Sequence, residues 1–124
     1  MPSPTLYRWS DIAPEQINDA ISRRYLNGDR VTLARFELKQ GGVVPMHVHD
    51  NEQVTFVVSG RLRFHMDGRE IDVGAGEVFQ IPGGLAHEVR VLEDALVVDV
   101  FSPVREDWVR GTDSYFQRRA PQPS

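Results

Sequence analysis

The chain has 124 residues, enough for one domain with a single core, and its formal net charge of −4 argues against binding to a nucleic-acid backbone. It contains no cysteine, which excludes disulfides and thiolate metal sites and leaves His, Gln, Asp and Glu as possible metal ligands. No apolar run approaches the roughly 20 residues of a membrane span, and the N-terminus lacks the pattern of a signal peptide. We therefore expect a cytoplasmic protein with no membrane partner.

Residues 1–19 are predicted to be an N-terminal arm, and its Pro-rich part, residues 1–14, is expected to wrap over the body of the protein. Residues 14–19 favour one helical turn, because proline is preset for the first position of a helix. The sequence has no internal repeat, so we expect a single domain over residues 1–124 with its core at about residues 20–104.

Short predicted strands separated by turn residues make up this core. The strongest turn signals are Asn27-Gly28 and Asp67-Gly68, and other glycines separate most of the remaining strands. The predicted strands are residues 20–26, 31–38, 43–49, 54–58, 61–66, 69–73, 78–81, 87–92 and 95–101. Many short strands with a turn about every ten residues are typical of an all-β barrel or sandwich.

The tail, residues 105–124, differs from the core in composition. Residues 106–110 favour a short helical turn. Residues 120–124 are expected to be disordered, as the last residues of a domain commonly are.

Two histidines in one extended segment suggest a metal site. His47 and His49 are two residues apart, so their side chains point to the same face of a strand. Imidazole nitrogen is a good ligand for Zn, Ni, Fe, Cu or Mn, and the Gln53 carbonyl oxygen and His87 are further candidate ligands. The alternative is that these are ordinary, partly exposed polar residues. His65 alternates with apolar neighbours and is expected at the surface.

Asp99 interrupts an apolar strand, and an ionised carboxylate costs several kcal/mol to bury without a partner. It should therefore face a wet cavity, a metal or an arginine. One interpretation is a buried ion pair with Arg35 or Arg105, and the other is an acid/base group at the mouth of the barrel. Phe101 is two residues further along the strand and could line the same cavity.

Three arginines are candidates for holding a substrate carboxylate with a bidentate guanidinium. Arg35 lies among apolar neighbours, Arg24 is a similar but weaker case, and Arg105 follows Pro103 in a loop. Alternatively, Arg35 could form a salt bridge at a dimer interface, and Arg105 could simply be solvated.

Two glycine-framed motifs resemble those of the cupin family, and their spacing and order match the family pattern. The first contains Gly41, His47, His49, Gln53 and Gly60, and the second contains Gly76, Pro82, Gly84 and His87. The resemblance implies a cupin-type barrel, a double-stranded β-helix or jelly roll. The family usually has Glu where Gln53 stands and Asn where Val91 stands, so the expected metal site here has one negative charge fewer.

The run from Asp99 to Asp107 resembles the small pectin-degradation cupins that open 4,5-unsaturated uronates into linear keto sugars. This resemblance implies that the metal ligands are three His and one Gln, namely His47, His49, Gln53 and His87. It implies that Asp99 is catalytic and that Phe101 and Arg105 assist it. Those enzymes can use a second Gln two residues after the metal-binding one, and Thr55 stands there in this chain.

These observations favour a metal-assisted proton transfer on a small hydroxy- or keto-carboxylate, with Ni, Zn, Fe or Mn polarising substrate oxygens and Asp99 moving the proton. Two other classes stay open: an iron-dependent dioxygenase, and a non-catalytic cupin that binds a small ligand. We also expect a homodimer, because residues 20–26 and 31–38 carry apolar side chains that a partner could cover. Cupins of this size commonly pair through these strands.

Overall fold

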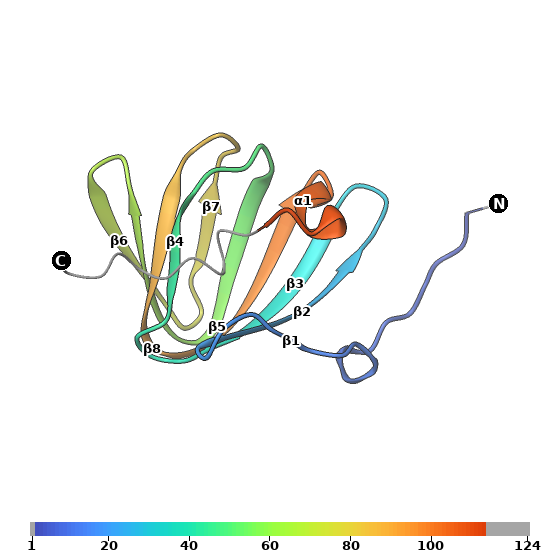
Figure 1. The fold of residues 1–124 in the computed structure, drawn as a ribbon, viewed down its shortest axis with the longest axis horizontal. Coiled ribbons are helices and arrows are strands. Elements are labelled where there is room, and N and C mark those ends of the chain that lie inside the picture. Colours follow the sequence, from blue (N-terminus) through green and yellow to red (C-terminus); the bar gives the residue numbers. More distant parts are fainter. Residues whose placement is uncertain (1, 114–124) are drawn as a thin grey trace.

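Two long strands, β5 (Glu52–Met66) and β8 (His87–Ser102), run side by side through the molecule and organise its fold (Figure 1). The computed structural model describes residues 2–113. The other elements are η1 (Trp9–Asp11), β1 (Glu15–Gln16), β2 (Ile21–Asn27), β3 (Thr32–Leu38), β4 (Val43–His47), β6 (Arg69–Gly74), β7 (Val78–Ile81) and α1 (Glu106–Arg110).

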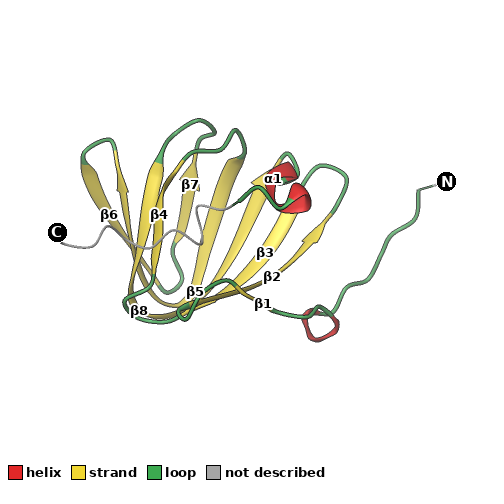
Figure 2. Ribbon diagram, viewed as in Figure 1, coloured by secondary structure: helices red, strands yellow, loops and turns green. Residues whose placement is uncertain are grey.

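All strands belong to one antiparallel sheet that folds over into two facing halves (Figure 2). The first half of β5 pairs with β7 and with the second half of β8, which also pairs with β3. The second half of β5 pairs with β6 and with the first half of β8, which also pairs with β4. This confirms the predicted all-β barrel of the jelly-roll type.

The sequence prediction divided β5 and β8 into two strands each, and this was wrong. The Ser59–Arg61 stretch is not a turn but an irregularity in the β5–β8 pairing, at which the strand continues. Gly60 has φ +85°, and a Cβ on it would overlap the carbonyl oxygen of Asp94 on β8. A glycine therefore allows the two strands to bend together here instead of separating.

The irregularity also changes which residues of β5 face the core. Before it, Thr55 and Val57 are buried, and after it the buried positions are Leu62, Phe64 and Met66. The inward set thus moves from odd to even numbers, as expected when one extra residue is inserted into a strand. The predicted apolar face of residues 61–66 is confirmed, and His65 on the opposite face is partly exposed.

The N-terminal region differs from the prediction in two ways. Residues 14–19 do not form a helical turn, because Glu15–Gln16 pair with β2 as a short strand and the backbone turns back at once to Ile21. The arm before it runs away from the barrel in Figure 1, and Leu6 is 79% exposed, so the arm does not cover its own chain.

The short helix α1 was predicted and lies at one end of the barrel (Figure 1). Its Trp108 is buried and packs edge-on against Phe36, Phe101 and Tyr25. Gly111 ends the helix in the left-handed conformation with φ +71°. The prediction for residues 120–124 lies outside the described residues. Within residues 2–113, no helix is long and apolar enough to cross a membrane.

Candidate metal centre

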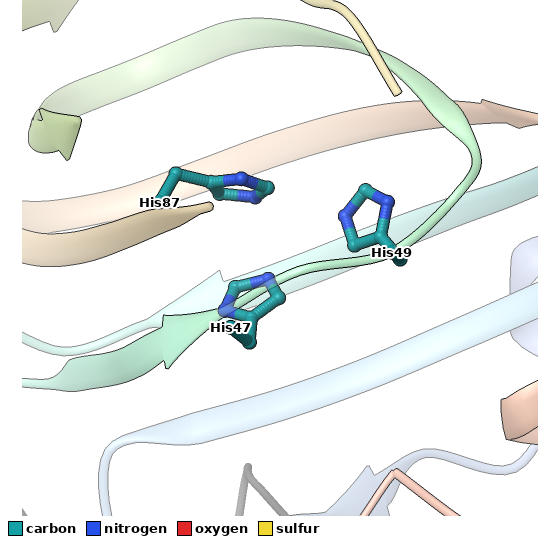
Figure 3. Close-up of side chains that lie close together, drawn as sticks. All are labelled: His47, His49 and His87. Atoms are coloured by element: carbon teal, nitrogen blue, oxygen red, sulfur yellow. The ribbon is translucent and has the colours of Figure 1, made fainter. Parts of the chain in front are cut away.

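Three histidine rings face one another at one end of the barrel (Figure 3). His47 ends β4 and is paired in register with His87, which begins β8, and His49 follows in the loop after β4. Each ring offers one nitrogen, and these three nitrogens all lie within 4.8 Å of one another. Strand pairing therefore brings together residues that are 40 positions apart in the chain, which sequence alternation alone could not establish for His87.

Backbone carbonyls fix the orientation of two of these rings. Nδ1 of His47 lies 2.8 Å from the carbonyl oxygen of Pro45, and Nδ1 of His87 lies 2.9 Å from that of Leu85. A carbonyl can only accept, so the proton of each neutral ring belongs on Nδ1 and the lone pair on Nε2. Nε2 of His87 is buried and has no hydrogen-bond partner in residues 2–113.

His49 gives the clearest indication that the site fits a cation. Its Nδ1 lies 3.1 Å from the carbonyl oxygen of Asn51, and its Nε2 lies 3.2 Å from Oε1 of Gln53. Both partners are acceptors, but a neutral imidazole has only one proton. A metal bound to Nε2 and Oε1 would satisfy both atoms and leave the proton on Nδ1. This donor set suits a divalent transition metal.

Burial keeps the three rings neutral. It lowers the pKa of His47 to about 3, with the neighbouring His87 adding to the effect. It lowers the pKa of His49 to about 4, with the positive charge of Arg105 as the next cause. It also lowers the pKa of His87. Neutral imidazole is the form that binds a metal, so the site is prepared for a metal at neutral pH.

A hydrogen-bonded chain leads from the histidines to Asp99. Nε2 of Gln53 donates to Oγ1 of Thr55 at 2.9 Å, and Oγ1 of Thr55 donates to Oδ1 of Asp99 at 2.5 Å. A longer contact of 3.5 Å joins Nε2 of Gln53 directly to Oδ1 of Asp99. All three side chains are buried. Thr55 is therefore part of the site, although in the sequence it only marked a departure from the pectin-degradation cupins.

Asp99 has no ion pair with any residue that the structure describes, so the alternative interpretation, a direct ion pair with Arg35 or Arg105, is wrong. Burial raises the pKa of Asp99 to about 6, although the hydrogen bond from Thr55, the charge of Arg105 and the Gln53 amide oppose the rise. A carboxyl group with a pKa close to neutrality can both accept and release a proton.

Arg105 and Asp99 line one cavity, but Arg105 is paired with Asp107. Its Nε and a terminal nitrogen donate to the two carboxylate oxygens at 2.9 and 2.7 Å. Its guanidinium group also lies over the rings of Phe101 and Trp108, 4.7 and 4.5 Å from their centroids. Burial raises the pKa of Asp107, but Arg105 outweighs this effect and holds the pKa below its usual value. Arg105 is 1% exposed and hence rigidly placed.

These groups enclose a cavity of about 50 Å³. Its polar wall is formed by His47, His87, Gln53, Thr55, Asp99 and Arg105, and the rest is apolar. Phe101 lines the cavity, as predicted from strand alternation. Its ring packs edge-on against that of His49, with 5.7 Å between the ring centroids. The space is suited to a small ligand or to the reactive end of a larger one.

Arg35 and Arg24 lie outside this cavity. They are paired with each other in register on β3 and β2, on the face opposite the buried Ala34 and Phe36. Arg24 forms an ion pair with Glu37 at 3.5 Å. Neither arginine is placed to hold a ligand at the histidines. The buried arginine of β2 is instead Arg23, which the sequence analysis missed, although its position two residues after Ile21 could have indicated it.

Arg23 joins β1 and the segment that follows α1 to the barrel. It is 3% exposed, lies 4.3 Å from the centre of the Trp108 ring, and forms ion pairs with Glu15 and Asp113. Trp108 is thus contacted by both Arg23 and Arg105, since each guanidinium lies over its ring. This arrangement fixes α1 over the cavity.

The loop that carries His49 is braced from two sides. The side-chain amide of Asn51 donates to the carbonyl oxygens of Pro103 and Val104, which joins the loop to the segment leading to Arg105. Gly83 lies so close to the loop that a Cβ there would overlap the carbonyl oxygen of Asp50. The Pro82–Gly84 turn is therefore a support for His49 as well as the entry to β8.

Comparison with known proteins agrees with this fold. A model of the cupin domain matches residues 34–101. An uncharacterized protein of Streptomyces coelicolor is 29% identical over 99 residues, which cover 78% of this chain and 94% of that protein. The oxalate-binding protein of Thermotoga maritima is 25% identical over 95 residues, which cover 66% of this chain and 78% of that protein. The structure of KdgF from a Halomonas species superposes with a TM-score of 0.77 at 24% identity, covering 84% of this chain and 99% of KdgF.

Proposed function

The chain belongs to the cupin family, and from this premise we propose that it is a metal-dependent enzyme acting on a small unsaturated uronate or a similar hydroxy- or keto-carboxylate. The proposed metal ligands are His47, His49, Gln53 and His87. The observation that carries the proposal is the position of Asp99, a carboxyl group with a pKa of about 6, in the same cavity as His47 and His87. The sequence motif from Asp99 to Asp107, which resembles the pectin-degradation cupins, supports this substrate class.

The residues of the cavity divide the work of such a reaction. A bound divalent metal would supply Lewis acidity, which polarises a substrate oxygen and acidifies neighbouring C–H and O–H groups. Oδ of Asp99 would take up a proton from the substrate and return it at another atom. Arg105 would attract the substrate carboxylate, and Phe101 would pack against its carbon skeleton. The apolar remainder of the cavity excludes water, which strengthens these electrostatic interactions.

Elemental analysis of the purified protein, followed by incubation with a 4,5-unsaturated uronate, tests this proposal. We expect about one equivalent of Ni, Zn, Fe or Mn per chain and a loss of the ultraviolet absorbance of the unsaturated uronate, abolished by chelation and restored by the metal. The Arg63→Lys variant is a suitable control, because Arg63 pairs with Asp72 on the outer surface, away from the cavity. A protein that contains no metal after growth in all four metals would contradict the proposal.

A non-catalytic binding protein is the second candidate, and the similarity to the oxalate-binding protein of Thermotoga maritima favours it. The small volume of the cavity agrees with a ligand of a few heavy atoms. Calorimetric titration of the metal-loaded protein with short dicarboxylates separates the two candidates. Tight binding of such an acid, with no change in the unsaturated uronate, would favour the binding protein over the enzyme.

We also propose that the protein is a homodimer. β1 pairs with β2 only at two positions, so the edge of β2 beyond Arg24 has no strand beside it in the described part of the chain. An open strand edge readily pairs with a second chain. Leu6 and Tyr7 of the arm are 79% and 49% exposed, and a partner could cover them. Light scattering should give twice the 14.1 kDa chain mass, and a monomer at micromolar concentration would contradict this.

A further inference from the structure

Thr55 occupies a central position that the proposed reaction does not yet use. It lies on β5 two residues after Gln53, is 1% exposed, and stands opposite Asp99 in the β5–β8 pairing. Its hydroxyl group contacts both neighbours, at 2.9 Å from Nε2 of Gln53 and 2.5 Å from Oδ1 of Asp99. A buried threonine with two short polar contacts is more than a space-filling residue.

The proton count of this chain determines its direction. A threonine hydroxyl has a single proton, and an ionised carboxylate can only accept, so Thr55 must donate to Asp99. The remaining lone pairs of Oγ1 can only accept, so they require a donor from Gln53. The NH₂ group of Gln53 is therefore turned toward Thr55, and its carbonyl oxygen is turned away, 3.2 Å from Nε2 of His49.

We propose that Thr55 is a positioning residue that selects which end of the Gln53 amide faces the histidines. This inference rests on the metal site of the proposed function. Only the oxygen of an amide is a useful metal ligand, so a flipped Gln53 would present NH₂ to the metal and repel it. Thr55 thus acts on the metal through Gln53 without touching the metal itself.

The same chain gives Gln53 some of the charge that it lacks compared with glutamate. Asp99 polarises the hydroxyl of Thr55, which in turn becomes a better acceptor for the Gln53 amide hydrogen. This stronger hydrogen bond polarises the amide group of Gln53 and so increases the negative partial charge on Oε1. The ionised Asp99 therefore strengthens a neutral ligand through two hydrogen bonds, instead of binding the metal directly.

Removal of the hydroxyl leaves Gln53 with a competing partner. Its Nε2 already lies 3.5 Å from Oδ1 of Asp99, a distance at the limit of a hydrogen bond. Without Thr55 the amide can rotate toward Asp99 and draw Oε1 away from His49. Thr55→Val, which replaces the hydroxyl by a methyl group of similar size, should therefore weaken metal binding without leaving a cavity.

The test measures metal affinity by competition with a chelator in the purified full chain, using Zn²⁺ and Co²⁺. We expect Thr55→Val and Thr55→Ala to bind about 10-fold or more weakly, as for other residues that orient a metal ligand. Thr55→Ser, which keeps the hydroxyl, should stay within about 3-fold of the unchanged protein. The visible absorption of bound Co²⁺ should shift in the Val variant and not in the Ser variant.

Thr32→Val is the matched control. Thr32 is also a fully buried threonine, and its hydroxyl donates to Asn27 and accepts the backbone N–H of Arg105 without contacting Gln53 or a histidine. This variant should lose stability but keep its metal affinity. Melting curves verify that each variant is folded, and Thr55→Ala serves if the Val variant is not.

His87→Ala separates the failure of this inference from the failure of the metal site. If His87→Ala loses the metal while folded Thr55→Val and Thr55→Ala bind it as tightly as the unchanged protein, the positioning role is refuted and the metal site stands. If His87→Ala also binds normally, the metal site itself is wrong. If Thr55→Ser is as weak as Thr55→Val, the hydroxyl is not the cause and the inference is overturned.

Discussion

Replacing Asp99 by asparagine separates a proton-transfer group from half of a buried ion pair, because the two roles predict stability changes of opposite sign. Breaking a buried ion pair typically costs about 3–5 kcal/mol, since the partner charge is left unpaired. In this structure the candidate partner, Arg105, already holds Asp107 with two hydrogen bonds. Asp99→Asn therefore removes a buried negative charge without leaving an arginine unpaired.

The magnitude follows from the pKa of Asp99. Its value rises from 3.8 to about 6 on folding, mainly by burial, and each pKa unit corresponds to about 1.4 kcal/mol. A carboxyl group with a raised pKa favours the folded state at low pH, and this contribution is lost as pH rises from about 4 through 6. The ionised Asp99 should therefore cost about 3 kcal/mol above pH 7, and Asp99→Asn should recover most of that.

Thermal unfolding of the chelated protein at pH 4.5 and pH 8 measures this difference. At pH 8 we expect Asp99→Asn to melt roughly 10 °C above the unchanged protein, and near pH 4.5 the two should be close. Turnover of the metal-loaded variant should be abolished at every pH, because asparagine cannot accept a proton. Asp107→Asn is the contrasting variant and should melt lower, since it removes the carboxylate charge that is paired with a 1% exposed guanidinium. A lower melting temperature for Asp99→Asn at pH 8, with activity retained, would refute the reasoning.

Three further predictions concern the metal centre. His87→Ala should remove most of the bound metal and Gln53→Ala less, because imidazole is the stronger ligand; elemental analysis after dialysis measures both. The pKa values of about 3 and 4 for His47 and His49 mean that the unfolded chain binds more protons below pH 6.5, so the chelated protein should lose stability as pH falls from about 6.5 to 4. Urea unfolding of the Asp99→Asn variant, which lacks the opposing titration, isolates this effect, and a flat profile would count against it. Gly83→Ala should lower metal affinity, because the added Cβ would overlap the carbonyl oxygen of Asp50 and displace the loop that carries His49. Equal metal affinity of this variant and the unchanged protein in chelator competition would contradict this.

The sequence was sufficient where the structure depends on local alternation or on spaced motifs. The apolar face of Leu62, Phe64 and Met66 and the shared cavity of Asp99 and Phe101 follow from the period of two in a strand. An all-β barrel or sandwich follows from many short strands and turns, and the resemblance of the two spaced motifs to cupins implied the jelly roll. These features need no knowledge of which strand pairs with which.

The sequence was insufficient where the structure depends on pairing between distant segments. Gly60 reads as a turn, but a carbonyl of β8 lies against it, and the strand bends instead of ending. Which arginine of β2 is buried, Arg23 or Arg24, depends on the register of this strand. The prediction based on apolar neighbours named Arg24, whereas Arg23 is the buried one. Thr55 looked like the loss of a functional residue, because only the β5–β8 register reveals that it faces Asp99.

The pairing of Arg105 with Asp107 explains how one cavity can contain both an arginine and a carboxyl group with a pKa near neutrality. A direct ion pair between Arg105 and Asp99 would lower the pKa of Asp99 well below its usual value and make it a poor base at neutral pH. Asp107 instead takes up the guanidinium group, and its own pKa is the one that is lowered. Arg105 then acts on Asp99 only at longer range, and burial raises the pKa to about 6. In the proposed reaction, Asp107 thus keeps Asp99 available for proton transfer, although it does not line the cavity.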